Sequence, residues 1–201
     1  MYSLILSRRK NNCVKPVDEK HDPWLTKSHK KIYANPWLEL TQYDVINPNG
    51  NEGIYGVIDF KNFAIGIVAL DEDLNTFLVG QWRYPLKQYS WEIPEGGGPV
   101  AIEPIESAKR ELVEETGIVA DDWKLIQTFY TSNSCTNEKA FIFLAKTLHF
   151  KEASPDDTEE LQVKKIPFND FFEKVLNSEI TDSLTVVAAF KVKYLLDNKL
   201  I

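Results

Sequence analysis

The segment Pro-Glu-Gly-Gly-Gly-Pro at residues 94–99 constrains the fold of this chain more than any other segment. Two prolines and three glycines in succession disfavour the interior of a helix and of a strand. Residues 104–115 have the opposite character, with a proline in the first turn, and Gly117 follows where a helix would end. The sequence therefore predicts an irregular glycine loop that leads directly into a helix.

The predicted helix carries three glutamates on one face. At about 100° per residue, Glu111 and Glu115 lie one turn apart and Glu114 lies beside them, so the three carboxylates fall within an arc of about 100°. Ile105, Ala108 and Leu112 form the adjoining apolar stripe. Because Glu115 borders this stripe, we expect it at the seam between the helix and a sheet.

Clustered carboxylates at this position indicate a cation site. Like charges one helical turn apart repel by tenths of a kcal/mol, and a divalent cation removes that repulsion. The alternative is a solvated acidic face neutralised by Lys109 and Arg110, which is the more common reason for such a helix taken alone. The glycine triplet just before the helix favours the site, because glycine allows close backbone approach around an ion or phosphate.

Length, composition and charge exclude several classes of protein. The 201 residues fit one domain with a terminal extension, and 43% hydrophobic residues are enough for a core. A net charge of −7 argues against a nucleic acid polymer as partner but not against a small phosphorylated substrate. Cys13 and Cys135 do not have a metal-ligand spacing, and no signal peptide or membrane span is evident. We expect a cytoplasmic protein without a membrane partner.

Hydrophobic periodicity predicts a mixed sheet with helices at its sides, an α/β fold. We divide the chain into an irregular arm at residues 1–30, a β-hairpin at residues 31–60 turning at residues 47–51, and a main domain at residues 61–201. Strands of the main domain are expected at 63–70, 76–82, 91–93, 123–130, 140–145 and 161–166, and its later helices at 168–177 and 184–197.

The segment from Gly96 to Ile118 resembles the Nudix box. It has Arg-Glu-Leu-Val-Glu-Glu-Thr-Gly-Ile at residues 110–118, at the family's spacing from Gly96. One position departs, because Ile102 stands where the pattern has a glutamate, with Glu103 next to it. Residues 79–96 and 178–183 are also similar to ADP-ribose pyrophosphatases of this family. The resemblance implies a Nudix α/β/α sandwich with a mixed sheet, whose N-terminal hairpin joins two subunits in a homodimer.

The resemblance also implies a metal centre that takes Mg²⁺ or Mn²⁺. Carried onto this chain, the ligands are Glu111 and Glu115, with Glu114 as an additional or second-metal ligand that also serves catalysis. The backbone carbonyl of Glu95 is a further ligand. The departure at Ile102 puts the geometry of the loop or the number of metal ions in question, rather than hydrolysis itself.

The base that activates water comes from a late acidic loop in related enzymes. Glu159 and Glu160 occupy that place, and Glu159 aligns slightly better. A carboxylate suffices as base because a metal ion lowers the pKa of water. The alternative is an exposed loop of ordinary acidic residues.

Substrate contacts follow from the same resemblance. Arg83 would contact phosphate, with a structural salt bridge as the alternative. Trp37 and Tyr55 would clamp the base, partly across the dimer, with packing as the alternative. Glu138 retains the final acid of the loop after the box, but Asn133 replaces a proline that often marks specificity for ADP-ribose.

We therefore predict metal-dependent hydrolysis of a nucleoside diphosphate linked to another group, giving a nucleoside monophosphate and a sugar phosphate. ADP-ribose is the first choice, and UDP- or GDP-linked hexoses and dinucleotides stay open. Three other interpretations remain: a nucleotide-sugar sensor without catalysis, which Ile102 favours; an enzyme for nucleoside triphosphates or capped RNA; and a plain acidic scaffold domain.

Overall fold

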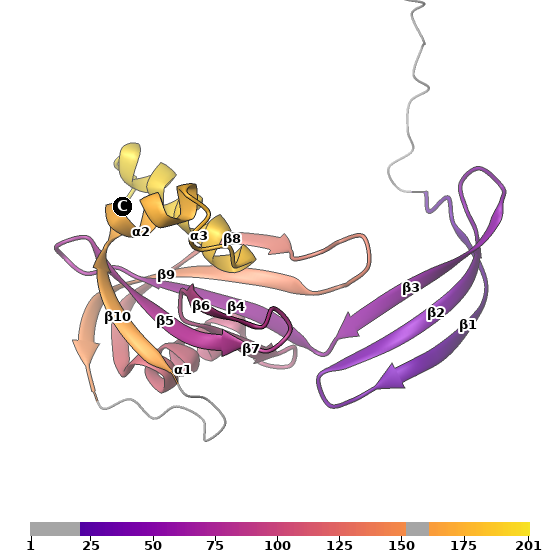
Figure 1. Ribbon diagram of the computed structural model, residues 1–201, viewed down its shortest axis with the longest axis horizontal. Coiled ribbons are helices and arrows are strands. Elements are labelled where there is room, and N and C mark those ends of the chain that lie inside the picture. Colours follow the sequence, from indigo (N-terminus) through magenta and orange to yellow (C-terminus); the bar gives the residue numbers. More distant parts are fainter. Residues whose placement is uncertain (1–20, 152–160) are drawn as a thin grey trace, which may run out of the picture.

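The computed structural model describes residues 21–151 and 161–201. Within these ranges a main body built from two sheets and three helices carries a separate N-terminal sheet, which projects from one end (Figure 1). The body contains a four-stranded sheet in the order β7-β4-β9-β8 and a three-stranded sheet in the order β10-β5-β6. Strands β4 and β9 are parallel and the other pairs are antiparallel, so the four-stranded sheet is mixed.

The body contains the predicted elements in the predicted order, and one additional strand, β7. The strands are β4 (Asn62–Ala69), β5 (Asn75–Arg83), β6 (Gln88–Glu92), β7 (Glu95–Pro99), β8 (Ile118–Tyr130), β9 (Lys139–Phe150) and β10 (Gln162–Pro167). The helices are α1 (Pro104–Thr116), α2 (Phe168–Leu176) and α3 (Ser183–Asp197). Helix α1 ends at Gly117, whose φ of 68° places it in the left-handed region, as its predicted role as terminator requires.

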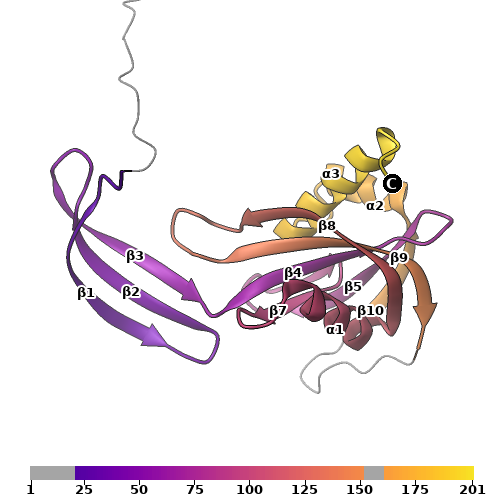
Figure 2. The ribbon, with the colours of Figure 1, turned by 180° about the vertical axis from the view of Figure 1, so that it is seen from behind.

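Helices cover both sides of the sheets, and each side has its own core. On β4, Ile65 and Ile67 pack with Leu112 of α1, whereas Val68 packs with Val192 of α3. This alternation follows from the period of two in a strand. The result is a three-layer α/β/α arrangement with α1 on one side and α2 and α3 on the other (Figures 1 and 2). Among the described residues, none of the helices combines the length and the apolar character needed to span a bilayer.

The N-terminal unit is a three-stranded antiparallel sheet rather than the predicted hairpin. It consists of β1 (Leu25–Ala34), β2 (Leu38–Ile46) and β3 (Glu52–Phe60), in that order. The predicted first strand is divided by a turn in which Asn35 Oδ1 accepts hydrogen bonds from the backbone N–H groups of Trp37 (2.9 Å) and Leu38 (2.8 Å).

Strand β1 also begins inside the segment predicted to be an irregular arm. Every residue of β1 is exposed, and its residues 26–31 are all polar. This part of the strand therefore has no alternation of apolar and polar residues from which a strand could be predicted. The predicted turn at residues 47–51 is present, with Gly50 at a φ of 83°.

The glycine segment is more regular than predicted. Residues Glu95–Pro99 form strand β7, which pairs with β4 at the edge of the four-stranded sheet. Pairing with β4 overcomes the low strand propensity of these residues. Because the glycines have no side chains, α1 can also pack closely over this strand. The break in regular structure that was expected between residues 94 and 99 is confined to the short connection between the end of β6 at Glu92 and the start of β7 at Glu95.

Candidate active site

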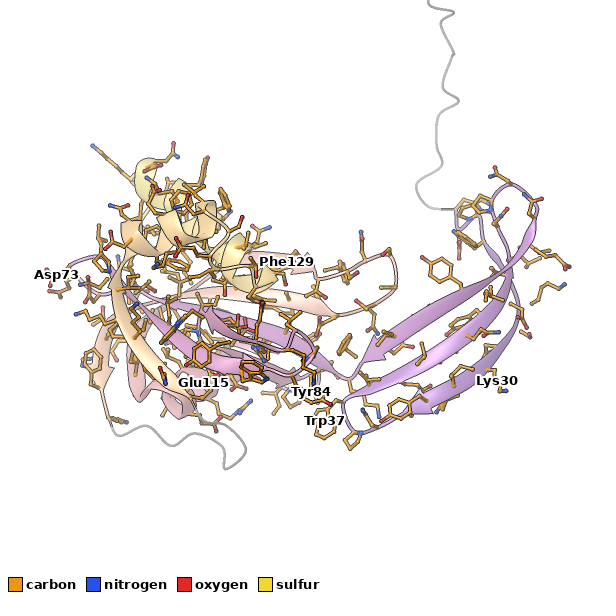
Figure 3. The ribbon with its side chains drawn as sticks, viewed as in Figure 1. Lys30, Trp37, Asp73, Tyr84, Glu115 and Phe129 are labelled. Atoms are coloured by element: carbon orange, nitrogen blue, oxygen red, sulfur yellow. The ribbon has the colours of Figure 1, made fainter. Side chains whose placement is uncertain are left out.

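A cleft of about 550 Å³ opens where β5, β6 and β7 meet the start of α3. Figure 3 shows Trp37 where the N-terminal sheet meets the body, and Glu115 on the side of α1. The cleft lining includes six residues that matter for the chemistry below: Trp37, Arg83, Glu92, Glu95, Glu138 and Asp182. Polar and apolar side chains share the lining, as is usual for a small-molecule site.

The carboxylates of α1 lie directly behind this cleft, against β7. Glu111 and Glu115 are buried, at 9% and 4% exposure, whereas Glu114 is partly exposed. Glu115 Oε2 accepts a hydrogen bond of 3.0 Å from the backbone N–H of Glu95. Glu115 thus lies at the seam between helix and sheet, and two of the three glutamates do not belong to a solvated helix face.

Arg110 connects the other two carboxylates to the glycine strand. Its Nη1 donates to Glu114 Oε2 at 2.6 Å, and its Nη2 donates to Glu111 Oε1 at 2.6 Å and to the carbonyl oxygen of Gly97 at 3.0 Å. The arginine therefore neutralises part of the cluster while fixing its position. Burial of two carboxylates is tolerable because they are hydrogen-bonded and paired.

Gly96 allows the cluster to lie so close to β7. A Cβ atom at this position would lie 2.2 Å from the carboxyl carbon of Glu111, well inside contact distance. Only glycine can place this carboxylate directly against the strand. The position that the sequence marked as the first glycine of the box is thus a steric requirement.

The donor set behind the cleft suits a hard divalent cation. Glu111, Glu114 and Glu115 supply carboxylate oxygens, and the adjoining strand supplies backbone carbonyls, of which that of Glu95 was predicted as a ligand. Oxygen-only sets of this kind match Mg²⁺ and Mn²⁺ better than softer metals. Ile102, where a further glutamate was expected, is 47% exposed, and Glu103 is exposed without a side-chain capping hydrogen bond.

A second carboxylate group, which sequence reasoning missed, lies in the cleft itself. One oxygen from each of Glu92, Glu95 and Asp182 lies within 4.8 Å of the other two. Asp182 also caps α3, because its Oδ2 accepts from the backbone N–H of Thr185 at 2.7 Å. Glu92 and Asp182 are far apart in the sequence, and only the packing of α3 against the strands brings them together.

Arg83 is held by this second group. Its Nε donates to both oxygens of Glu92 at 3.0 Å, and its Nη2 donates to Glu92 and, at 2.6 Å, to Glu95 Oε1. The ion pair considered as the alternative for Arg83 therefore exists. Its side chain is still 34% exposed at the cleft, so pairing and ligand contact are compatible.

The ionised form of the Glu95 carboxyl is destabilised in this group. Burial raises its pKa well above the ordinary value of 4.5, and the neighbouring charges of Asp182 and Glu92 raise it further, while Arg83 opposes them. Its Oε2 is buried without a hydrogen-bond partner among the described residues. A proton on this carboxyl would relieve both the repulsion and the unmet hydrogen bond.

Replacing Glu95 with glutamine should stabilise the protein increasingly as pH rises. A carboxyl whose pKa is raised in the folded state favours folding below its ordinary pKa, and this contribution is lost as pH rises from about 4.5 toward the raised value. Glutamine mimics the protonated form and cannot lose a proton. Urea unfolding from pH 4 to pH 8 should show the variant gaining free energy of unfolding over wild type above pH 4.5. Exposed Glu103→Gln is the control, and parallel curves for Glu95→Gln and wild type would contradict the assignment.

Two of the predicted substrate-binding residues considered next line the cleft, and a third, Tyr55, does not. Trp37, in the turn between β1 and β2, and Glu138, at the end of the loop after β8, both line the cleft, and Glu138 Oε2 accepts from Thr131 Oγ1 at 2.6 Å. Tyr55 lies outside the cleft that the described residues form. Its hydroxyl donates to the carbonyl oxygen of Ser134, and its ring packs edge-on against Trp24 at 5.4 Å.

Other predicted residues fall elsewhere. Glu159 and Glu160, the candidate bases, lie outside the described residues.

Besides the carboxylates, the cleft contains Gln81 and Ser90, which were not predicted. These two are cross-strand partners of β5 and β6 and share a face with Arg83 and Glu92. The period of two on the predicted strand at 76–82 was a signal for Gln81, whereas Ser90 lies just outside the predicted strand at 91–93.

Two family models match different parts of the chain. A family model described as NUDIX domain matches residues 61–185. A second model, described as nucleoside diphosphate sugar hydrolase N-terminal domain, matches residues 23–58.

Individual relatives match most of the chain. An ADP-ribose pyrophosphatase of Bacillus subtilis (strain 168) is 30% identical over 184 residues, which cover 90% of this chain and 95% of that protein. A methanol dehydrogenase activator of Bacillus methanolicus is 29% identical over 168 residues, covering 83% and 89%. A crystal structure of an ADP compounds hydrolase superposes with a TM-score of 0.79 at 20% identity, covering 88% of this chain and 95% of that one. The last likeness concerns the fold alone.

Proposed function

Because this chain belongs to the Nudix family of hydrolases, we propose that it cleaves the pyrophosphate bond of a nucleoside diphosphate linked to a sugar, with ADP-ribose as the first substrate. The family membership and the Nudix α/β/α fold predicted from the sequence are confirmed. The products would be a nucleoside monophosphate and a sugar phosphate. The N-terminal sheet, similar to that of nucleoside diphosphate sugar hydrolases, supports a sugar-linked substrate over a nucleoside triphosphate.

The observation that carries the proposal is the burial of Glu111 and Glu115 beside the floor of the cleft. With Glu114 and the carbonyl of Glu95 they would hold a divalent cation, Mg²⁺ or Mn²⁺. Such a cation, when bound, would neutralise diphosphate charge and lower the pKa of water. Arg110 holds the carboxylates of Glu111 and Glu114 in place before any ligand arrives, and the backbone N–H of Glu95 holds that of Glu115.

Arg83 would bind a substrate phosphate. Four hydrogen bonds to the carboxylates of Glu92 and Glu95 fix the plane of its guanidinium, so little conformational entropy remains to be lost on binding. Glu92 and Glu95 thereby act as positioning residues for Arg83. The base that activates water stays a prediction for Glu159 or Glu160.

The outer part of the cleft would hold the base and the sugar. Trp37 is 65% exposed at the cleft, and a stacked nucleobase would cover its ring, a contact of about 1–3 kcal/mol in single-stranded nucleic-acid sites. Glu138 would accept hydrogen bonds from sugar hydroxyls. Tyr55 would reach a base only if a second copy of the chain paired with the N-terminal sheet in a homodimer, as the exposed edge strand β1 allows.

Incubation of the purified protein with Mg²⁺ and ADP-ribose tests this function. We expect AMP and ribose 5-phosphate in equal amounts, and no products when EDTA removes the cation. A panel with UDP- and GDP-hexoses, NADH and diadenosine compounds would rank substrates by kcat/KM. Ligand bound but uncleaved across the panel would contradict hydrolysis and favour a regulatory role, of the kind that the name of the Bacillus methanolicus relative describes.

A further inference from the structure

The loop between β8 and β9 joins the N-terminal sheet to the body. Residues 131–138 run beside the end of β3, and both ribbon views show this loop reaching toward the sheet (Figures 1 and 2). The backbone N–H of Ile58 donates to the carbonyl oxygen of Cys135 at 2.8 Å, and Ile58 forms an isolated parallel bridge with Thr136. The loop therefore extends the pairing of β3 by a short stretch.

Asn137 makes the side-chain contribution to this junction. Its Oδ1 accepts from the backbone N–H of Phe60 at 2.8 Å, and its Nδ2 donates to Asp59 Oδ1 at 3.0 Å. A side-chain amide is required for both, because one atom must accept and the other must donate. An aspartate at position 137 could accept from Phe60 but would face the carboxylate of Asp59.

Both ends of this junction lead to residues that line the cleft. On one side, Phe60 is followed by Lys61, whose backbone N–H donates to the carbonyl oxygen of Trp37 at 2.9 Å. On the other side, Asn137 is followed by Glu138. Trp37, Phe60 and Glu138 all line the cleft. A continuous path of backbone and hydrogen bonds thus connects the exposed indole of Trp37 to the carboxylate of Glu138 through Asn137.

We propose that Asn137 is a positioning residue, which sets the separation between Trp37 and Glu138 and so determines affinity for the base and sugar parts of the substrate. This inference rests on the proposed function. The contacts that Asn137 makes, to Phe60 and Asp59, are distinct from those that hold the carboxylates of α1, so it acts on binding more than on the chemical step. Loss of an interaction that serves ground state and transition state alike raises KM and leaves kcat nearly unchanged.

The test is a charge swap across the Asn137–Asp59 contact. In Asn137→Asp the two carboxylates repel, and we expect KM for ADP-ribose to rise about tenfold, the equivalent of one lost hydrogen bond, while kcat stays within about twofold. The double variant Asn137→Asp with Asp59→Asn restores a donor and an acceptor, so KM should return toward the wild-type value. Asn49→Asp, in the turn after β2, makes the same charge change away from the junction and should leave KM unaltered.

Two further measurements separate this inference from the proposed function. Hydrogen exchange at the Phe60 amide should accelerate in Asn137→Asp and recover in the double variant, and the Kd of ADP-ribose in EDTA should follow the same pattern even if the wild-type protein cleaves nothing. Faster exchange with unchanged KM and Kd would show that Asn137 only supports the fold, and would overturn the proposal. A fall in kcat at constant KM would overturn it as well. If Asn137→Asp does not fold, Asp59→Ala carries the test, because it removes the acceptor of the Asn137 amide without adding charge, and KM and Kd should rise while kcat stays within about twofold.

Discussion

Glu115→Gln should lower kcat for ADP-ribose by roughly a thousandfold, equivalent to about 4 kcal/mol of the barrier, while the protein stays folded. The buried carboxylate of Glu115 accepts a hydrogen bond from the backbone N–H of Glu95. A glutamine oxygen can accept the same bond, but the amide lacks the negative charge that a divalent cation needs. Steady-state kinetics in Mg²⁺ and thermal unfolding of the same preparation measure the two effects.

The matched control for this change is Glu106→Gln on the same helix. Glu106 is exposed and pairs with Lys109 at 2.8 Å, away from the strand. Its replacement should leave turnover within about twofold, because exposed pairs contribute little. Equal turnover in wild type and Glu115→Gln would show that the carboxylate of Glu115 is not needed for the reaction and would leave it only a structural role.

Gly96→Ala should reduce turnover by about a hundredfold and lower the Tm by about 4–8 °C. The new Cβ would lie 2.2 Å from the carboxyl carbon of Glu111, and the strand cannot retreat because Gly96 is paired with Ile65 of β4. The end of the Glu111 side chain must therefore move, at about 2 kcal/mol for overpacking. A displacement of about 1 Å near the reacting groups is enough to cost a hundredfold in rate.

Gly53→Ala provides the comparison for the glycine variant. A Cβ at Gly53 of β3 would meet nothing within 4 Å, so both Tm and turnover should remain close to wild type. Kinetics and differential scanning calorimetry on both variants distinguish a local steric effect from a general effect of adding a methyl group to a strand. A fully active Gly96→Ala protein would show that the carboxylate of Glu111 need not lie against β7.

Local signals predicted the bounds of helix α1 well. Proline in the first turn, carboxylates and apolar residues at helical spacing, and Gly117 gave a helix at 104–115, and α1 spans Pro104–Thr116. The burial of Glu115 also followed, because its position next to the apolar stripe is a property of helix geometry alone.

Features that depend on tertiary pairing were not predictable in the same way. Strand β7 exists because β4 lies beside it, although its own residues disfavour a strand. Strand β1 is exposed along its whole length and polar throughout residues 26–31, so it is specified by its pairing with β2. Asp182 joins Glu92 and Glu95 only through the packing of α3. Tyr55 was predicted to clamp the base, partly across a dimer, and within one chain its hydroxyl donates to the carbonyl oxygen of Ser134.

The separate cores on the two sides of β4 give the molecule a degree of modularity. Ile67 and Val68 are adjacent in the chain, yet one supports the helix that bears the carboxylates and the other supports the pair of C-terminal helices. Substitutions in the two compartments should combine nearly independently, because they share few neighbours. A lineage could therefore remodel the layer of α2 and α3, including the Asp182 wall of the cleft, while the layer of α1 retained the geometry that the chemistry demands.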